Sequence, residues 1–229
     1  MSKCHSGSMR RGLKSASIAV LLATTAAGAQ AGPKDWTTAG QDLGGQRFSR
    51  AVQITPANVT DLKEAWTYHL MTPEAKAVAA ANAALPVEQR RGSTTGLRLS
   101  ETIPVVVGDT MYIGSPFSRV IALDATTGKE KWVFQVPNNE SPSVRGVSYW
   151  KGGAGAPASI VFGTRAGKMY SLNAKTGKLN PKFGVGGVVN MKTPEMMQNG
   201  PDELLILPTQ PIIYKNLIIT GAGSGEGPG

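Results

Sequence analysis

An eight-residue motif occurs twice in this chain and reveals an internal repeat. ALDATTGK, at 122–129, returns as SLNAKTGK at 171–178. Ahead of each copy, and once more near the end of the chain, a proline opens an apolar stretch: Pro104, Pro157 and Pro211, spaced by 53 and 54 residues. A period of about 50 residues is typical of a β-propeller, in which each repeat forms one four-stranded blade. The repeat therefore predicts an all-β fold, a partial β-propeller of about two and a half blades.

Apolar runs and residue alternation place the strands within each repeat. The first repeat holds four expected strands, at 102–107, 110–114, 120–124 and 131–135. The second holds expected strands at 144–150, 159–163, 168–172 and, more weakly, 179–183, and the third holds only 211–214 and 217–220. Before the repeats, 62–70 is interpreted as an isolated outer strand and the alanine-rich 73–85 as a short helical insertion.

The repeated motif itself predicts a turn. Asp124 can accept hydrogen bonds from the backbone ahead of it, and Gly128 can adopt a positive φ at no steric cost. Trp132 follows the turn and is expected to pack between blades. Asp109 and Asp124 are accordingly interpreted as turn residues.

The first 31 residues are interpreted as a signal peptide. Arg10, Arg11 and Lys14 precede a short apolar run, and Ala29-Gln30-Ala31 supplies small residues at the spacing that a signal peptidase accepts. The alternative is an uncleaved membrane anchor, but the apolar run is shorter than the roughly 20 residues of a spanning helix. The sequence therefore predicts a periplasmic protein whose mature part, residues 32–229, is the propeller domain.

The charge and the cysteine content limit the classes of partner and cofactor site that the chain can have. The formal net charge of +9 falls to +5 without the predicted signal peptide, since 20 basic residues then face 15 acidic ones. No basic run interleaved with aromatic residues appears, so we expect no nucleic-acid partner, whereas a mild positive charge suits an anionic small molecule. Cys4 is the only cysteine, and without it the mature part has no disulfide, CxxC metal site or CxxCH haem site.

Five ordered segments resemble one known family. They are DWTTAGQDLGGQRFSRAVQITPANVTDLKEAW (35–66), SETIPVVVGDTMYIG, VIALDATTGKEKW, VRGVSYW and KTGKLNPKFGVGGVV. Their order and spacing resemble those of the pyrroloquinoline quinone (PQQ)-dependent alcohol and glucose dehydrogenases of bacteria. The resemblance implies an eight-bladed propeller with PQQ and a calcium or lanthanide ion in an axial funnel. It also implies that this chain is the amino-terminal part of a longer enzyme.

The resemblance further implies a set of cofactor-binding residues. PQQ is a planar quinone with three carboxylates, so its pocket needs a guanidinium, hydroxyl or amide donors and a cation. Arg145, in VRGVSYW, matches the family's cofactor-binding arginine, and Glu101, at the start of the first inner strand, matches a glutamate that contacts PQQ. Thr209, in PTQP, matches a threonine whose hydroxyl reaches the cofactor. The alternatives are an exposed loop arginine, a solvent-facing glutamate and a turn-stabilising threonine.

The glycine-rich segment GAGSGEG completes the implied site. Glu226 lies where the family places a metal-binding glutamate, with a solvated loop residue as the alternative. Gly223, Ser224 and Gly225 are implied to let the backbone approach the cofactor closely. No residue is assigned as catalytic, because the family's aspartate base belongs to a later blade, and we expect the fragment itself to be inactive.

Departures from the family pattern refine the expected function. Many quinoprotein alcohol dehydrogenases carry two adjacent cysteines just before the arginine segment, where this chain reads ESPSVRGV. The absence of these cysteines favours a glucose-dehydrogenase-like enzyme or another polyol or alcohol dehydrogenase. The resemblance implies a respiratory quinone or cytochrome c as the electron acceptor. A single signal peptide favours membrane contact that is at most peripheral. The alternative from another class is a non-catalytic propeller scaffold of outer-membrane protein assembly.

Overall fold

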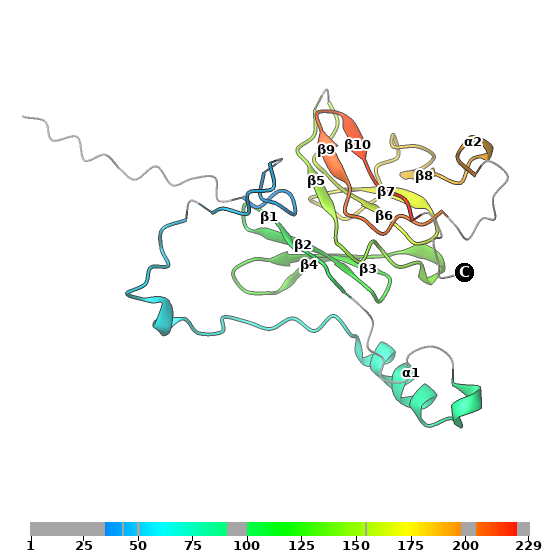
Figure 1. The fold of residues 1–229 in the computed structure, drawn as a ribbon, viewed down its shortest axis with the longest axis horizontal. Coiled ribbons are helices and arrows are strands. Elements are labelled where there is room, and N and C mark those ends of the chain that lie inside the picture. Colours follow the sequence, from blue (N-terminus) through cyan, green and yellow to red (C-terminus); the bar gives the residue numbers. More distant parts are fainter. Residues whose placement is uncertain are drawn as a thin grey trace, which may run out of the picture. The chain divides into compact units, whose positions relative to one another are not determined.

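The computed structural model describes residues 35–42, 44–49, 51–90, 100–153, 155–197 and 205–223. The predicted signal peptide lies outside the described residues. Antiparallel strands dominate the described part, and they form two four-stranded sheets and one two-stranded sheet (Figure 1). The all-β prediction of about two and a half blades is confirmed.

Each four-stranded sheet is a meander whose spatial order follows the chain. The first sheet consists of β1 (Val105–Val107), β2 (Thr110–Ser115), β3 (Arg119–Asp124) and β4 (Glu130–Gln135). The second consists of β5 (Ser148–Trp150), β6 (Ser159–Gly163), β7 (Lys168–Asn173) and β8 (Val188–Asn190). β9 (Ile212–Tyr214) and β10 (Leu217–Ile219) form the hairpin expected for the third repeat.

One predicted strand of the second sheet is in the wrong place. The segment 179–183 does not form the fourth strand, which is β8. Pro181 lacks a backbone N–H and cannot contribute a full ladder, and the N–H of Phe183 donates to the carbonyl of Asn180 at 3.0 Å in a turn. Only Leu179 retains a bridge, to Leu172.

The innermost strands are shorter than predicted. β1 omits Thr102 to Pro104, so Glu101 precedes the inner strand instead of opening it. β5 begins at Ser148 because Ser143 to Gly146 form a turn, in which the N–H of Gly146 donates to the carbonyl of Ser143 at 3.2 Å. The predicted outer strand at 62–70 is also wrong as a strand, since it pairs with no described strand.

The repeated turns form as the motif predicts. The carboxylate of Asp124 accepts from the N–H groups of Thr126 and Thr127 at 3.1 and 2.8 Å, and Gly128 has φ +70°. In the second copy the amide oxygen of Asn173 takes the same role and Gly177 has φ +69°. These bonds close each turn within five residues, so they depend little on the rest of the fold.

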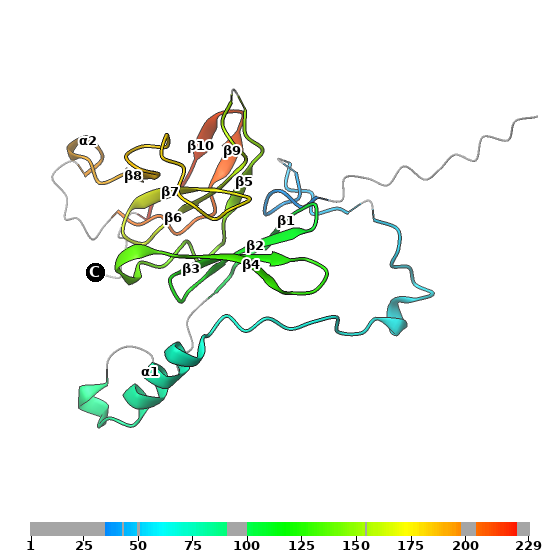
Figure 2. The same ribbon diagram turned by 180° about the vertical axis from the view of Figure 1, so that it is seen from behind.

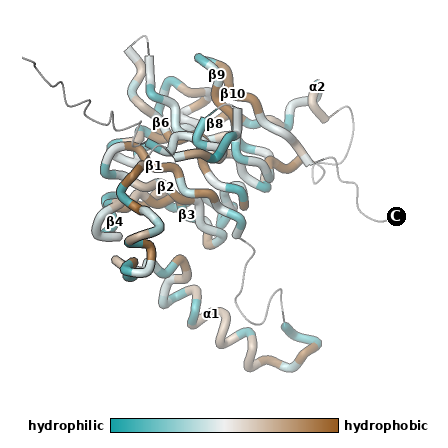
Figure 3. Tube along the Cα trace, turned by 60° about the vertical axis from the view of Figure 1, so that its left-hand side comes forward, coloured by the Kyte–Doolittle hydropathy of each residue, from teal (hydrophilic) through white to brown (hydrophobic). Residues whose placement is uncertain are grey.

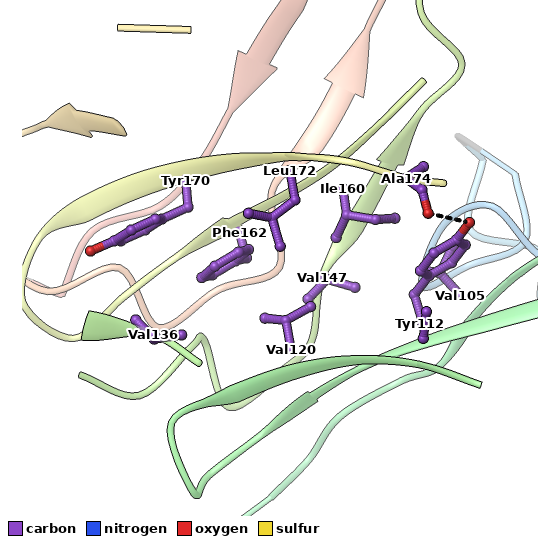
Figure 4. Packing of buried hydrophobic residues seen from close by; sticks show 11 residues of the cluster. Val105, Tyr112, Val120, Val136, Val147, Ile160, Phe162, Tyr170, Leu172 and Ala174 are labelled. Carbon is purple, nitrogen blue, oxygen red and sulfur yellow. Dashed lines mark hydrogen bonds between the residues drawn. The ribbon is translucent and has the colours of Figure 1, made fainter. Parts of the chain in front are cut away.

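A shared core joins the two four-stranded sheets. Val120 and Val147 meet Phe162 and Leu172 there, all fully buried (Figure 4). The rings of Phe162 and Tyr170 stack with centroids 5.2 Å apart. Burial of several such side chains at about 1.5–3 kcal/mol each makes this interface a main source of stability.

Tryptophans fasten successive repeats together. The indole N–H of Trp132, on β4, donates to the carbonyl of Ala174 at 3.0 Å, in the turn that follows β7. Trp66 makes the same contact to Ala125 at 3.2 Å, after β3. Trp132 therefore packs between the two sheets as predicted. Trp66 likewise contacts the first sheet, although its own segment pairs with no described strand.

The described helices are short. α1 (Pro73–Ala83) confirms the predicted insertion, and the hydroxyl of Thr72 caps it by accepting from the N–H of Ala75 at 3.2 Å. α2 spans Pro194–Met197, and single 3-10 turns span Val59–Asp61, Val87–Gln89 and Pro137–Asn139. α1 has no buried residue, and hydrophilic and apolar residues are interspersed along its trace (Figure 3). Among the described residues, no helix has the length and apolar character to span a membrane.

The β9–β10 hairpin lies beside β5 (Figure 2). Ser148, the first residue of β5, donates its hydroxyl to the carbonyl of Pro211. One residue earlier, the carbonyl of Val147 accepts from the side-chain amide of Gln210 at 2.5 Å. These bonds hold the segment that precedes β9 against the segment that precedes β5.

Candidate functional site

Loops that precede three inner strands surround a cavity of about 340 Å³. The strands are β1, β5 and β9, and a fourth segment, 38–47, contributes from the amino-terminal side. The lining comprises Thr38, Ala39, Gly40, Asp42, Gly45, Arg47, Glu101, Ile103, Arg145, Thr209, Gln210, Pro211 and Ile212. Three residues predicted from the sequence, Glu101, Arg145 and Thr209, therefore meet in one cavity.

A tight turn positions Arg145. Its N–H donates to the hydroxyl of Ser143 at 3.2 Å, and that hydroxyl donates to the carbonyl of Pro208 at 2.6 Å. Gly146 follows with φ +113°, and a Cβ there would lie 3.0 Å from the carbonyl oxygen of Ile103. Glycine at 146 thus lets this turn approach the loop before β1 closely, and the turn holds the Arg145 side chain next to that loop.

Arg145 and Glu101 form an ion pair across this turn. The guanidinium Nη1 lies 3.3 Å from Oε2 of Glu101, and the two side chains are 59% and 58% exposed. The backbone N–H of Glu101 also donates to the carbonyl of Val144 at 2.9 Å, which fixes the glutamate beside the arginine. Exposed pairs of this kind contribute at most about 1 kcal/mol, so a stronger anion can displace the glutamate at little cost.

Thr209 stabilises the local turn structure, which was the alternative to cofactor binding. Its hydroxyl accepts from the N–H of Gly221 at 3.1 Å and lies 3.2 Å from the carbonyl of the same residue. It lies 3.3 Å from the hydroxyl of Thr220. The side chain therefore joins the segment before β9 to the segment after β10, and it also lines the cavity.

The predicted glycine-rich loop is only partly described. Gly223 pairs with Ile206, donating its N–H to that carbonyl at 2.9 Å, and a Cβ at Gly223 would lie 2.6 Å from the Ile206 side chain. Gly223 does not line the cavity. Ser224, Gly225 and Glu226 lie outside the described residues, and their assigned roles stay predictions.

Two contributions to the cavity escaped the sequence analysis. The segment 38–47 belongs to the first family-like motif, but its residue types alone assign it no function. Gln210 stands in the PTQP motif next to Thr209, and its Oε1 is buried with no hydrogen-bond partner among the described residues. A glutamine between a threonine and a proline does not indicate a binding site in the sequence. Its place at the cavity depends on a bond to Val147, 63 residues away.

The charges around the cavity are balanced. The lining contains two cations, Arg47 and Arg145, and two carboxylates, Asp42 and Glu101. Among these described residues, Arg145 and Glu101 are in ion-pair contact. Among the described residues, no group of three or more His, Cys, Asp or Glu side chains is arranged to hold a metal ion. The metal prediction rests on Glu226, so the described residues leave it untested.

Asp109 and Asp124 lie in turns and do not line the cavity. A hydrogen bond from Lys131 holds the pKa of Asp109 below its usual value, and the Lys131 ammonium lies 2.9 Å from that carboxylate. The hydroxyl of Thr127 lowers the pKa of Asp124. This geometry agrees with the interpretation of both as turn residues.

The residues of the cavity fit a planar polycarboxylate such as PQQ. Its volume is within the range of roughly 300–1,000 Å³ of small-molecule pockets, and a half-exposed guanidinium can form two parallel bonds to a carboxylate. A second cavity of about 500 Å³, between the second sheet and the hairpin, is mostly apolar and includes none of the predicted site residues.

Comparison with known proteins identifies the family. Residues 36–227 match the beta-propeller domain of the PQQ-dependent glucose, ethanol and alcohol dehydrogenases. The chain belongs to this PQQ dehydrogenase family. The predicted resemblance is thereby confirmed, and the family match favours it over the scaffold alternative.

Individual relatives agree with the family match. The quinoprotein glucose dehydrogenase of Escherichia coli (strain K12) is 34% identical over an alignment of 207 positions that covers 83% of this chain and 23% of that protein. The dehydrogenase subunit of the quinone-linked alcohol dehydrogenase of Gluconobacter oxydans (strain 621H) is 32% identical over 85% of this chain and 22% of its own length. This PQQ dehydrogenase chain therefore spans less than a quarter of the length of these two relatives.

Solved structures confirm the propeller architecture. The quinohemoprotein alcohol dehydrogenase from Comamonas testosteroni superimposes with a TM-score of 0.58 at 28% identity, over 86% of this chain and 24% of that one. A europium-containing methanol dehydrogenase matches with a TM-score of 0.55 at 22% identity, which shows a shared fold.

Proposed function

We propose that this chain forms part of the cofactor pocket of a PQQ-dependent dehydrogenase that oxidises an alcohol or a sugar. The observation that carries the proposal is the convergence of Glu101, Arg145 and Thr209, from three separate loops, on one cavity. The family match supports PQQ as the ligand class. The glucose dehydrogenase of Escherichia coli is among the relatives, which favours a glucose-dehydrogenase-like enzyme.

Each residue has a distinct binding role in this proposal. Arg145 exchanges its exposed ion pair with Glu101 for a carboxylate or quinone oxygen of the ligand, at a cost of about 1 kcal/mol or less. Glu101, released from that pair, also contacts the ligand. Thr209 holds the loop after β10 in place through Gly221 and offers its hydroxyl to the ligand. When bound, PQQ supplies the quinone that accepts the electrons of the substrate.

The remaining components of the proposal come from the sequence. Glu226 binds a calcium or lanthanide ion, and Ser224 and Gly225 admit the ligand, while Gly223 holds the start of this loop against Ile206. A signal peptide at 1–31 directs the protein to the periplasm, and a respiratory quinone or cytochrome c receives the electrons. Relatives named for a quinone acceptor and for cytochrome c support this class of acceptor.

Calorimetric titration of the purified chain with PQQ and Ca²⁺ tests the proposal. We expect saturable heat, and we expect Arg145→Ala to weaken binding roughly ten- to a hundredfold, because hydrogen bonds to charged groups contribute about 1.5–3 kcal/mol. Arg165→Ala is the matched control, since Arg165 does not line the cavity. Heat no greater than that of dilution, or equal losses in the two variants, would refute the proposed function.

A further inference from the structure

The main chain of Arg145 is fixed from two sides. Its carbonyl accepts from the N–H of Ile103 at 3.3 Å, which ties it to the loop before β1. Its N–H donates to the hydroxyl of Ser143 at 3.2 Å. That hydroxyl donates in turn to the carbonyl of Pro208 at 2.6 Å, in the segment that leads to Thr209 and β9. The arginine therefore stands between the first and the third repeat, and the hydroxyl of Ser143 connects it to the third.

The buried hydroxyl of Ser143 serves both bonds at once. The residue is 2% exposed. A carbonyl only accepts hydrogen bonds, so the single hydroxyl proton points to Pro208 and a lone pair remains for the N–H of Arg145. The backbone of Ser143 is fixed separately, because its N–H donates to the carbonyl of Gly163, the last residue of β6, at 2.8 Å. Removal of the hydroxyl therefore breaks both bonds and leaves the backbone of Ser143 attached to the second sheet.

Without these two bonds the main chain of Arg145 has more freedom. A residue that samples several backbone conformations must be ordered again when a ligand binds, and this ordering costs free energy. A ligand that meets a preorganised group avoids that cost. The side chain does little to hold the turn by itself, since its ion pair with Glu101 is exposed and weak. The affinity of Arg145 for an anion therefore depends on how firmly its main chain is held.

We propose that Ser143 is a positioning residue of this cavity, and that its hydroxyl holds Arg145 in the place from which the guanidinium binds the anionic ligand. The inference rests on the proposed function, in which Arg145 binds a carboxylate or quinone oxygen of PQQ. Ser143 is buried and does not line the cavity, so it acts through Arg145 and not by touching the ligand. Its effect on binding therefore requires the arginine side chain.

A double-mutant cycle between Ser143 and Arg145 tests this role. PQQ with Ca²⁺ is titrated calorimetrically into the wild-type chain, Ser143→Ala, Arg145→Ala and the double variant. We expect Ser143→Ala to weaken binding roughly tenfold in the wild-type background, because binding must then order the turn. In the Arg145→Ala background we expect the same change to have no effect, since no guanidinium is left to position. Equal affinity of Arg145→Ala and the double variant also shows that the cavity is folded without the hydroxyl.

Ser148→Ala is the matched control. Ser148 is 4% exposed, and its hydroxyl likewise donates to a proline carbonyl of the segment around Thr209, that of Pro211, but this bond does not involve Arg145. We expect any loss of affinity in Ser148→Ala to be the same with and without the arginine side chain. The inference is overturned if the loss in Ser143→Ala is absent or equal in the two backgrounds, or if Ser148→Ala depends on Arg145 in the same way. Each of these results leaves the proposed function standing, whereas absence of PQQ binding by the wild type overturns both.

Discussion

Single glycines decide whether neighbouring sheets can meet. Gly177 has φ +69°, and a Cβ there would lie 2.6 Å from the indole of Trp132. Gly108 has φ +59° but faces open space. The two positions share the cost of a positive φ and differ in the contact with a tryptophan.

We expect Gly177→Ala to lower the midpoint of thermal unfolding more than Gly108→Ala does. The backbone cost of each change is about 1 kcal/mol, and only Gly177→Ala must also displace Trp132 from the carbonyl of Ala174. Differential scanning fluorimetry of the two variants beside the wild type measures the difference. Equal shifts would mean that the indole contact contributes nothing to stability.

The environment of Tyr170 leads to a prediction on pH. Burial, and then the charge of Glu140, raise the pKa of Tyr170 to about 12, above the value of about 10 in an unfolded chain. The folded state therefore binds the proton more tightly, and stability is complete below pH 10 and falls as the pH rises towards 12. We expect Tyr170→Phe to show a smaller loss of thermal midpoint between pH 10 and 12. A variant that tracks the wild type throughout would exclude this contribution.

At the scale of elements, the loop after β4 is fastened to the second sheet by one carboxylate. Glu140 is 9% exposed, and its Oε1 lies 2.6 Å from the ammonium of Lys168, at the start of β7. Its Oε2 accepts from the hydroxyls of Thr164 and Tyr170 at 3.2 and 3.4 Å. The loop that leads to Arg145 is therefore anchored on the sheet beside it.

We expect Glu140→Gln to destabilise the protein by roughly 1–3 kcal/mol, because the ammonium of Lys168 loses its charged partner. Asp109→Asn is the control, since that carboxylate is 79% exposed beside Lys131 and solvent screens the pair. Thermal midpoints of both variants test the contrast. A larger shift for Asp109→Asn would show that burial does not decide the strength of these pairs.

At the scale of the whole molecule, one face of the β9–β10 hairpin is uncovered. Ile212, Tyr214, Leu217 and Ile219 alternate with inward-facing residues and are all exposed. Ile213 and Ile218, on the other face, pack against the cluster around Leu207. Exposed apolar faces and unpaired strand edges favour association.

We therefore expect the purified 229-residue chain to associate and to bind a hydrophobic dye. Light scattering after size-exclusion chromatography, with dye fluorescence on the same fractions, measures both. Leu217→Lys should reduce association, because it places a charge on the uncovered face. Val185→Lys, at an exposed turn residue outside the hairpin, is the control. A monomer with a sharp, reversible melting transition would contradict the prediction.

The sequence by itself determined the repeat, the turns and most strands. The bonds of the Asp124 turn lie within five residues, and strand alternation has a period of two, so both are readable locally. The family motifs also predicted three residues that meet in the cavity. The position of β8 was not predictable in this way, because pairing at 188–190 depends on where the chain returns after the turns at 180–187.

Only the tertiary structure decided what completes the cavity. The place of Gln210 in the lining follows from a bond to Val147, 63 residues away, and the anchoring of Arg145 follows from a bond between Ser143 and Pro208, 65 residues apart. Local propensity carries no information on such contacts, because they exist only once separate repeats have packed together. The repeats specify the blades, and the packing of one blade on the next specifies the site.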